Sequence, residues 1–142
     1  MNPILRNILA VLAGLVVGSI INGAIIALGH QLFPIQVEAD LNTPEGLALA
    51  LPHFRAEHYL MPFLAHALGT FVGAFLAAYI GVSLRKILAL IVGVFFFAGG
   101  VMMIAMISPP LWFILLDLGV AYIPMALLAH YIVTKYFVKP LF

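Results

Sequence analysis

The sequence predicts an all-α membrane protein, a four-transmembrane-helix bundle with a long outer loop that carries a short interfacial helix. Hydrophobic side chains make up 65% of the 142 residues and charged ones only 8%, whereas a soluble domain uses about 25%. Four apolar runs each reach the length of about 20 residues that a helix needs to cross the hydrocarbon core. Because these runs fill the chain, we predict a single transmembrane domain over residues 1–142. The scarcity of charge excludes a soluble domain, a disordered chain and a nucleic-acid binder.

Helix-terminus signals fit the limits of the apolar runs. Asn2 followed by Pro3 is typical of a helix N-terminus, and Ser108 followed by Pro109 repeats that pattern before the fourth run. Pro34 ends the first helix, because the residue before a proline is disfavoured in helical geometry. The predicted spans are 8–29, 60–82, 87–107 and 111–134.

The only long stretch between spans is the outer loop, residues 31–59. Within it, Thr43 and Pro44 form a helix-start signal in front of the apolar segment 47–51. This segment is too short to cross a bilayer, so we expect an interfacial helix that lies at the membrane surface.

Basic residues predict the orientation, because short loops rich in Lys and Arg stay in the cytoplasm. Arg55 alone falls in the outer loop. The remaining basic residues fall on the opposite side of a four-span arrangement: Arg6, Arg85, Lys86, Lys135 and Lys139. Both termini are therefore expected in the cytoplasm.

Small residues recur every four positions on two of the spans. Helices associate in lipid by close backbone contact, so such rows predict packing faces. The first row is Ala10, Gly14 and Gly18, and the second is Gly69, Gly73, Ala77 and Gly81. The rows serve either to hold one protomer together or to form a homo-oligomer, and both readings stay open.

Three polar side chains interrupt the apolar spans at nearly the same depth in the membrane. Asn22 lies about 11 Å inside the outer end of its helix, and His66 and Asp117 lie about 9 Å inside theirs, at 1.5 Å per residue. An Asp near the centre of a bilayer costs about 2.5 to 3.5 kcal/mol on insertion scales. We therefore expect all three to point inward, away from lipid.

Further polar groups extend this cluster into a predicted pocket in the outer half of the bundle. Thr70 shares a helix face with His66, and His58 precedes His66 by eight residues on the same side. Pro62 and Pro124 each free a backbone carbonyl in the interior. The predicted pocket residues are Asn22, His66, Asp117, Thr70, His58 and Glu57.

Two interpretations of the cluster stay open: a buried hydrogen-bond network that fixes helix register, or a site for a ligand, ion or proton. No cofactor is predicted. His58, His66 and Asp117 carry suitable donor atoms for a metal, but no pair has the spacing of a metal motif, and the two histidines lie about 12 Å apart along the helix.

Two segments, PFLAHALGTFVGA (62–74) and DLGVAYIPM (117–125), resemble the recurrent stretches of a family of small, uncharacterised four-span bacterial membrane proteins. The resemblance implies a bacterial inner membrane and brings no activity with it. Arg55, Ala56, Glu57 and Pro62 are similar to the second-helix motif of the membrane-associated eicosanoid and glutathione metabolism enzymes, but the Asn and the later Glu of that motif are missing here.

Three functions follow as hypotheses. In the first, the outward-facing pocket of a non-enzymatic bundle binds or passes a small solute, ion or proton. In the second, a membrane enzyme acts on a lipid or other apolar substrate, with Asp117, His66 or Glu57 as acid and base. In the third, the protein is a structural or accessory subunit. The absence of a nucleophile motif or cofactor fingerprint favours a protein that is not an enzyme.

Overall fold

The computed structural model describes residues 2–138, which contain helices and no strand. The helices are α1 (Pro3–Leu32), α2 (Pro44–Ala50), the short 3-10 helix η1 (Leu51–His53), α3 (Ala56–Ile80), α4 (Arg85–Ile107), α5 (Leu111–Val120) and α6 (Ile123–Tyr136).

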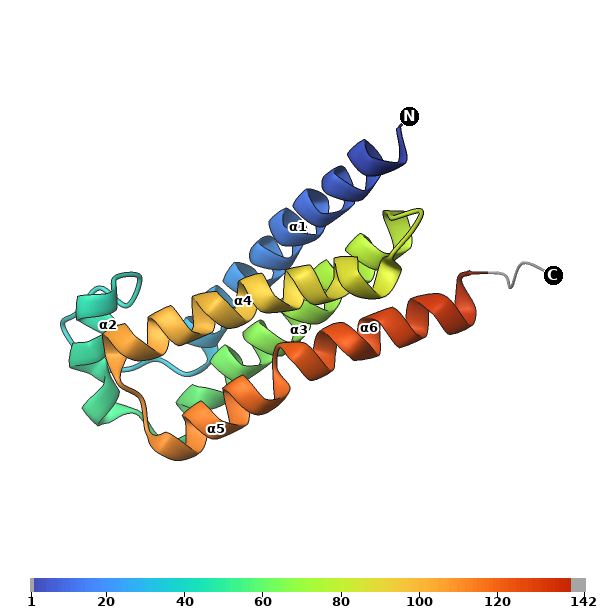
Figure 1. The fold of residues 1–142 in the computed structure, drawn as a ribbon. Coiled ribbons are helices and arrows are strands. Elements are labelled where there is room, and N and C mark those ends of the chain that lie inside the picture. The colour runs from blue at the N-terminus through green and yellow to red at the C-terminus, as the bar shows by residue number, and fades with distance from the viewer. Residues whose placement is uncertain (1, 139–142) are drawn as a thin grey trace.

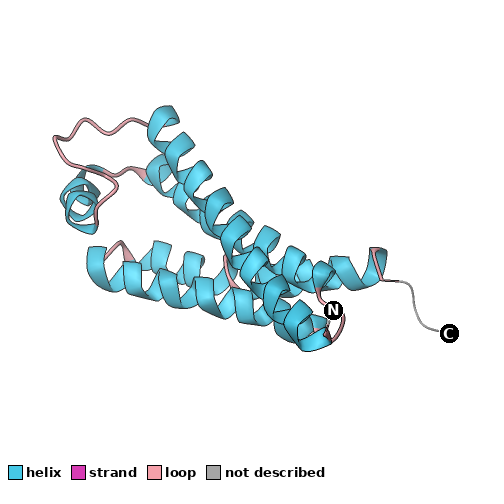
Figure 2. Ribbon diagram, turned by 90° about the horizontal axis from the view of Figure 1, so that it is seen from above, coloured by secondary structure: helices cyan, strands magenta, loops and turns pink. Residues whose placement is uncertain are grey.

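Four helical segments are long and apolar enough to cross a membrane: α1, α3, α4, and α5 together with α6. They form an antiparallel bundle, with α2 and the α4–α5 turn at one end and the first turn of α1 and the last turn of α6 at the other (Figure 1). We call these the α2 end and the far end. The helices diverge toward the α2 end, where α2 lies across the opening (Figure 2). The protein is an integral membrane protein, and the predicted four-helix bundle is confirmed.

The first helix begins where its cap predicts. The side chain of Asn2 accepts a hydrogen bond from the Ile4 N–H at 2.8 Å. At this far end, the Arg6 Nε donates to the Ile80 carbonyl at 2.9 Å, and Asn7 donates to Ser83 at 2.9 Å. These bonds connect the first turns of α1 to the end of α3. Helix α1 therefore begins at Pro3, five residues before the apolar run that starts at residue 8.

Helix α1 packs against α3 through backbone contact at glycines. A Cβ atom added to Gly73 would lie 2.6 Å from the Gly14 carbonyl oxygen, and one added to Gly69 would lie 2.9 Å from that of Gly18. Real Cβ atoms do not approach so closely, so any side chain at these positions would force the helices apart.

The loop at the α2 end contains the expected short helix. Thr43 caps α2 by accepting a hydrogen bond from the Gly46 N–H at 3.1 Å, and Pro44 occupies the first turn. The helix packs against α4. Because Gly46 lies directly against the Asp40 backbone, the loop is held close to the helix.

The fourth span begins at Leu111, as predicted, but Ser108 and Pro109 do not form its cap. Ser108 ends α4 in the left-handed conformation with φ of 48°, and α5 begins only after Pro110. Three consecutive residues thus form the turn, because Pro109 and Pro110 each disfavour helical geometry in the residue before them.

The fourth span is also two helices rather than one. It breaks at Ala121 and Tyr122, and Pro124 stands in the first turn of α6. A proline cannot bond to the carbonyl four residues earlier, here that of Val120, and its ring obstructs that carbonyl. The proline therefore accounts for the break.

The half of the bundle toward the far end is filled by small and branched apolar side chains. Ala74, Ala77 and Ala78 of α3 pack there with Val92 of α4 and Val133 of α6, all fully buried. The basic residues Arg6, Arg85, Lys86 and Lys135 lie at the far end beyond this core, whereas Lys139 lies outside the described residues.

Candidate functional site

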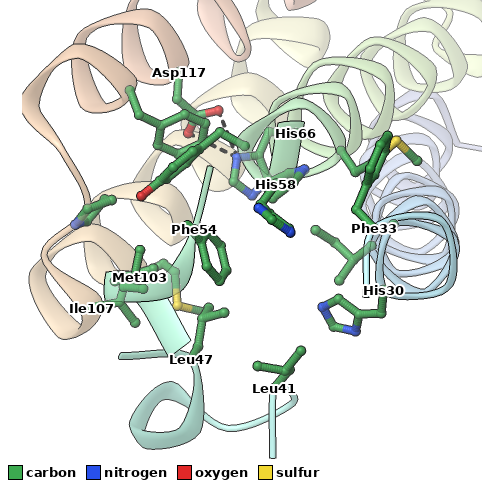
Figure 3. Close-up of a pocket in the computed structure, with 18 of the residues that line it drawn as sticks. His30, Phe33, Leu41, Leu47, Phe54, His58, His66, Met103, Ile107 and Asp117 are labelled. Atoms are coloured by element: carbon green, nitrogen blue, oxygen red, sulfur yellow. Dashed lines mark hydrogen bonds and ion pairs between the residues drawn. The ribbon is translucent and has the colours of Figure 1, made fainter. Parts of the chain in front are cut away.

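Asp117 of α5 and His66 of α3 are hydrogen-bonded to each other inside the bundle. The His66 Nδ1 lies 2.8 Å from one carboxylate oxygen and 2.9 Å from the other (Figure 3). Asp117 is only 1% exposed, whereas the His66 side chain retains 20% exposure. With the carboxylate ionised, Nδ1 is the donor, so the pair satisfies a charge that the apolar surroundings would otherwise penalise.

Tyr122 completes the environment of this carboxylate. Its hydroxyl donates to the second oxygen of Asp117 at 2.9 Å, and its ring stacks on the His66 ring with centroids 5.6 Å apart. Tyr122 is fully buried in the break between α5 and α6. The carboxylate is thus held from two sides, and the imidazole has one orientation.

The pair lies at the base of a cavity of about 340 Å³ that opens toward the α2 end. Its walls are mainly apolar and come from α1, α3, α4, α5 and the loop that carries α2. Asn22 lines the same base. Figure 3 shows the rings of His30 and His58 turned toward this space, with Leu41 and Leu47 on the side of the α2 loop. The cavity therefore combines apolar walls with a few convergent polar groups, as small-molecule sites do.

Asn22 and Thr70 differ in what surrounds them. Asn22 is half-buried and lines the cavity. Thr70 is fully buried away from the cavity, and its hydroxyl has no partner among residues 2–138. Thr70 belongs to the packing beneath the site.

His58 and Glu57 both line a surface groove, but only His58 also lines the cavity. The His58 Nδ1 accepts a hydrogen bond from the Arg55 N–H at 2.8 Å and so caps α3, while its ring lines the cavity. Glu57 lies outside the cavity, exposed and 3.9 Å from Arg55, in a surface groove that His53 also lines. Adjacent residues at the start of a helix point about 100° apart, which explains why only one of the two reaches the cavity.

The donor atoms considered for a metal do not converge. In the part of the chain that the structure describes, no three His, Asp or Glu side chains are placed to share an ion. The Nδ1 atoms of His58 and His66 are both occupied, by a backbone N–H and by the Asp117 carboxylate.

Sequence reasoning missed Tyr122 as part of the site. In an unbroken helix, residues five apart point in different directions, so Tyr122 is not expected beside Asp117. The available signal was Pro124, which predicts a freed carbonyl and also a helix break one turn before it.

Comparisons of this chain with known protein families, with characterised proteins and with solved structures find no match.

Proposed function

We propose that this membrane protein binds a small solute in its intramembrane pocket, and that the His66–Asp117 pair holds the polar end of that solute. The observation that carries the proposal is the position of the pair: a carboxylate 1% exposed beneath an imidazole that reaches the cavity. Ionisable groups within spans are costly and commonly mark ligand or ion sites.

The walls indicate the class of solute. The volume of about 340 Å³ lies within the range of about 300 to 1,000 Å³ that is usual for small-molecule sites. Apolar side chains surround most of this space, and Asn22 and His66 supply hydrogen bonds at its base. A molecule with an apolar body and one hydrogen-bonding end is complementary to the apolar walls and to the polar base of the cavity.

Binding is favoured over free passage across the membrane. Below the site, the core between α3, α4 and α6 is formed by fully buried alanines and valines such as Ala77, Val92 and Val133. An ion or a proton would have to cross this apolar region without a polar partner, which is expensive in a low-dielectric interior.

A second candidate function is a membrane enzyme that acts on an apolar substrate. The favouring observation is that Asp117 engages Nδ1 of His66, while Nε2 makes no hydrogen bond to the described residues. A carboxylate that orients a histidine in this way leaves the other ring nitrogen available as a general base.

We also propose that the protein lies in the cytoplasmic membrane with the α2 end outside. The support is the distribution of charge, since Arg6, Arg85 and Lys86 all lie at the far end and positive charges favour the cytoplasmic side. The similarity of residues 62–74 and 117–125 to a bacterial four-span family is the basis for proposing a bacterial inner membrane.

The test is to purify the protein in a mild detergent and to identify co-purified small molecules by native mass spectrometry. Asp117→Asn and His66→Gln are compared with wild type, and His53→Gln, which lies outside the cavity, is the control. We expect one compound to be retained by wild type and the control and reduced about tenfold in the site variants, because a hydrogen bond to a charged group contributes about 1.5 to 3 kcal/mol.

Equal retention by all four proteins would contradict the pocket proposal. If no compound is enriched in wild type over bulk lipid, the accessory-subunit hypothesis becomes the better one. Turnover of the retained compound that depends on His66 would support the enzyme.

A further inference from the structure

A second hollow of about 510 Å³ lies on the flank of the bundle between α1 and α4. Leu15 and Ser19 of α1 line one wall, and Phe95, Phe96 and Gly99 of α4 line the other. Phe95 is 62% exposed beside it. Because α1 and α4 are both membrane spans, this groove faces the lipid rather than an aqueous surface.

The groove and the cavity share one wall. Asn22 and Gly23 of α1, His66 of α3, and Gly100 and Met103 of α4 line both hollows. The polar base of the proposed binding site is therefore reached from the flank as well as from the α2 end.

Packing on both sides explains why the groove is open. Helix α1 is held on α3 through Gly14 and Gly73, while α4 is held on α6, where a Cβ atom at Gly93 would lie 2.8 Å from that of Ala126. Between them, Cβ atoms added at Gly23 and at Gly99 would meet nothing within 4 Å. The two helices are thus drawn apart at the groove by their separate partners.

We propose that the groove is a lateral opening for a single-chain amphiphile dissolved in the membrane, with its polar end in the cavity and its alkyl chain in the groove. This inference rests on the proposed binding function and names the class of ligand. The opening makes the bilayer, rather than the aqueous phase, the source of the ligand.

The residues that line the groove and the cavity change from apolar near the bilayer centre to polar toward the α2 end. This order matches the orientation of a lipid in the leaflet at the α2 end. The apolar residue Leu15 lies seven positions, or about 10 Å, deeper in the membrane than Asn22. His30 and His58 lie on the other side of Asn22, toward the α2 end. A chain along Leu15 and Phe96 would point toward the bilayer centre, and the head would meet the histidines, which is how lipids of that leaflet are oriented.

The test uses vesicles of equal parts phosphatidylethanolamine and phosphatidylglycerol with a trace of lysophosphatidylcholine whose acyl chain carries a diazirine. After illumination, adducts are mapped by mass spectrometry in wild type, Gly99→Trp and Gly119→Trp. Gly119 is the matched control, because it is also exposed with open space around it but lines neither hollow. We expect adducts on Phe96 and Met103 that fall about fivefold in Gly99→Trp, equivalent to about 1 kcal/mol, and stay unchanged in Gly119→Trp.

Ser19→Trp obstructs the same groove from α1 without lining the cavity, and it replaces Gly99→Trp if that variant does not elute as a folded protein. Adducts spread evenly over the lipid-facing residues, or equal in the groove and control variants, would overturn the lateral opening. The binding proposal would survive that result if a co-purified compound is still lost in Asp117→Asn. If that compound is also retained in Asp117→Asn, both proposals fail.

Discussion

The hydroxyl of Tyr122 donates a hydrogen bond to the carboxylate of Asp117 across the break between α5 and α6, at 2.9 Å. Five residues of unbroken α-helix would place these side chains about 140° apart around the axis. The break is therefore what allows one short segment to supply both the acid and its hydrogen-bond donor.

Removing this donor should destabilise the fold. We expect Tyr122→Phe to lower the stability by about 1 to 3 kcal/mol, because a buried carboxylate loses one of its hydrogen bonds. Thermal unfolding in detergent measures the effect. Tyr131→Phe is the control, since its hydroxyl meets Lys135 at the exposed surface, and it should change the stability by less than about 0.5 kcal/mol. Equal melting temperatures for the two variants would contradict a role for Tyr122 in holding the carboxylate.

Substitutions at Asp117 should separate the loss of charge from the loss of hydrogen bonding. Asp117→Asn keeps an oxygen that accepts from Tyr122 or His66, whereas Asp117→Leu leaves the Tyr122 hydroxyl and the His66 ring N–H unpaired, at about 1 to 3 kcal/mol each. We expect Asp117→Leu to melt at a lower temperature than Asp117→Asn. Adding Tyr122→Phe to Asp117→Leu should then recover part of the stability, because one unpaired donor is removed. Additive losses in the double variant would argue against this hydrogen-bonded arrangement.

The contact between α1 and α3 should not tolerate a single methyl group. In Gly73→Ala the new Cβ would lie 2.6 Å from the Gly14 carbonyl oxygen, so we expect a loss of about 1 to 3 kcal/mol from overpacking. Gly119→Ala adds the same methyl group in open space and serves as the control. Size-exclusion profiles and melting temperatures of the two variants give the comparison. Wild-type behaviour of Gly73→Ala would mean that the helices are farther apart than described.

Labelling of single cysteines should report the orientation. The chain contains no cysteine, so Asn42→Cys in the α2 loop and Val82→Cys in the α3–α4 turn each introduce one thiol. We expect a membrane-impermeant maleimide to label Asn42→Cys in intact cells and Val82→Cys only after the membrane is permeabilised. Val82 lies among the basic residues, which favour the cytoplasmic side. The reverse pattern would place the α2 end in the cytoplasm.

The number of spans and the caps at Asn2 and Thr43 were predictable because they depend on local sequence. Apolar length determines a membrane helix, and a side-chain oxygen two or three residues before a free N–H determines a cap. Pro109 and Pro124 were harder to interpret, because each proline is compatible with a helix start, a kink or a break, and only the tertiary contacts select one.

The candidate site also contains residues that were predictable from local sequence and residues whose position depends on the tertiary structure. Asp117, His66 and Asn22 stand out in the sequence because polar groups are expensive inside spans, and the structure places all three at the base of one cavity. Glu57 was also expected in the pocket but lies outside the cavity, because the direction of its side chain depends on where α3 begins. Tyr122 was not grouped with them because its position depends on the break.

The dependence of α1 on α3 has a consequence for how the chain is made. Helices α1 and α3 contact each other through Gly14, Gly18, Gly69 and Gly73, and all four are synthesised before α4 and the last span. The α1–α3 pair is therefore able to assemble during membrane insertion. At that stage Asp117, which follows His66 by 51 residues, has not yet been synthesised. The His66–Asp117 pair forms only after the last span is made, so a chain that stops before α5 holds His66 inside the membrane without its carboxylate partner.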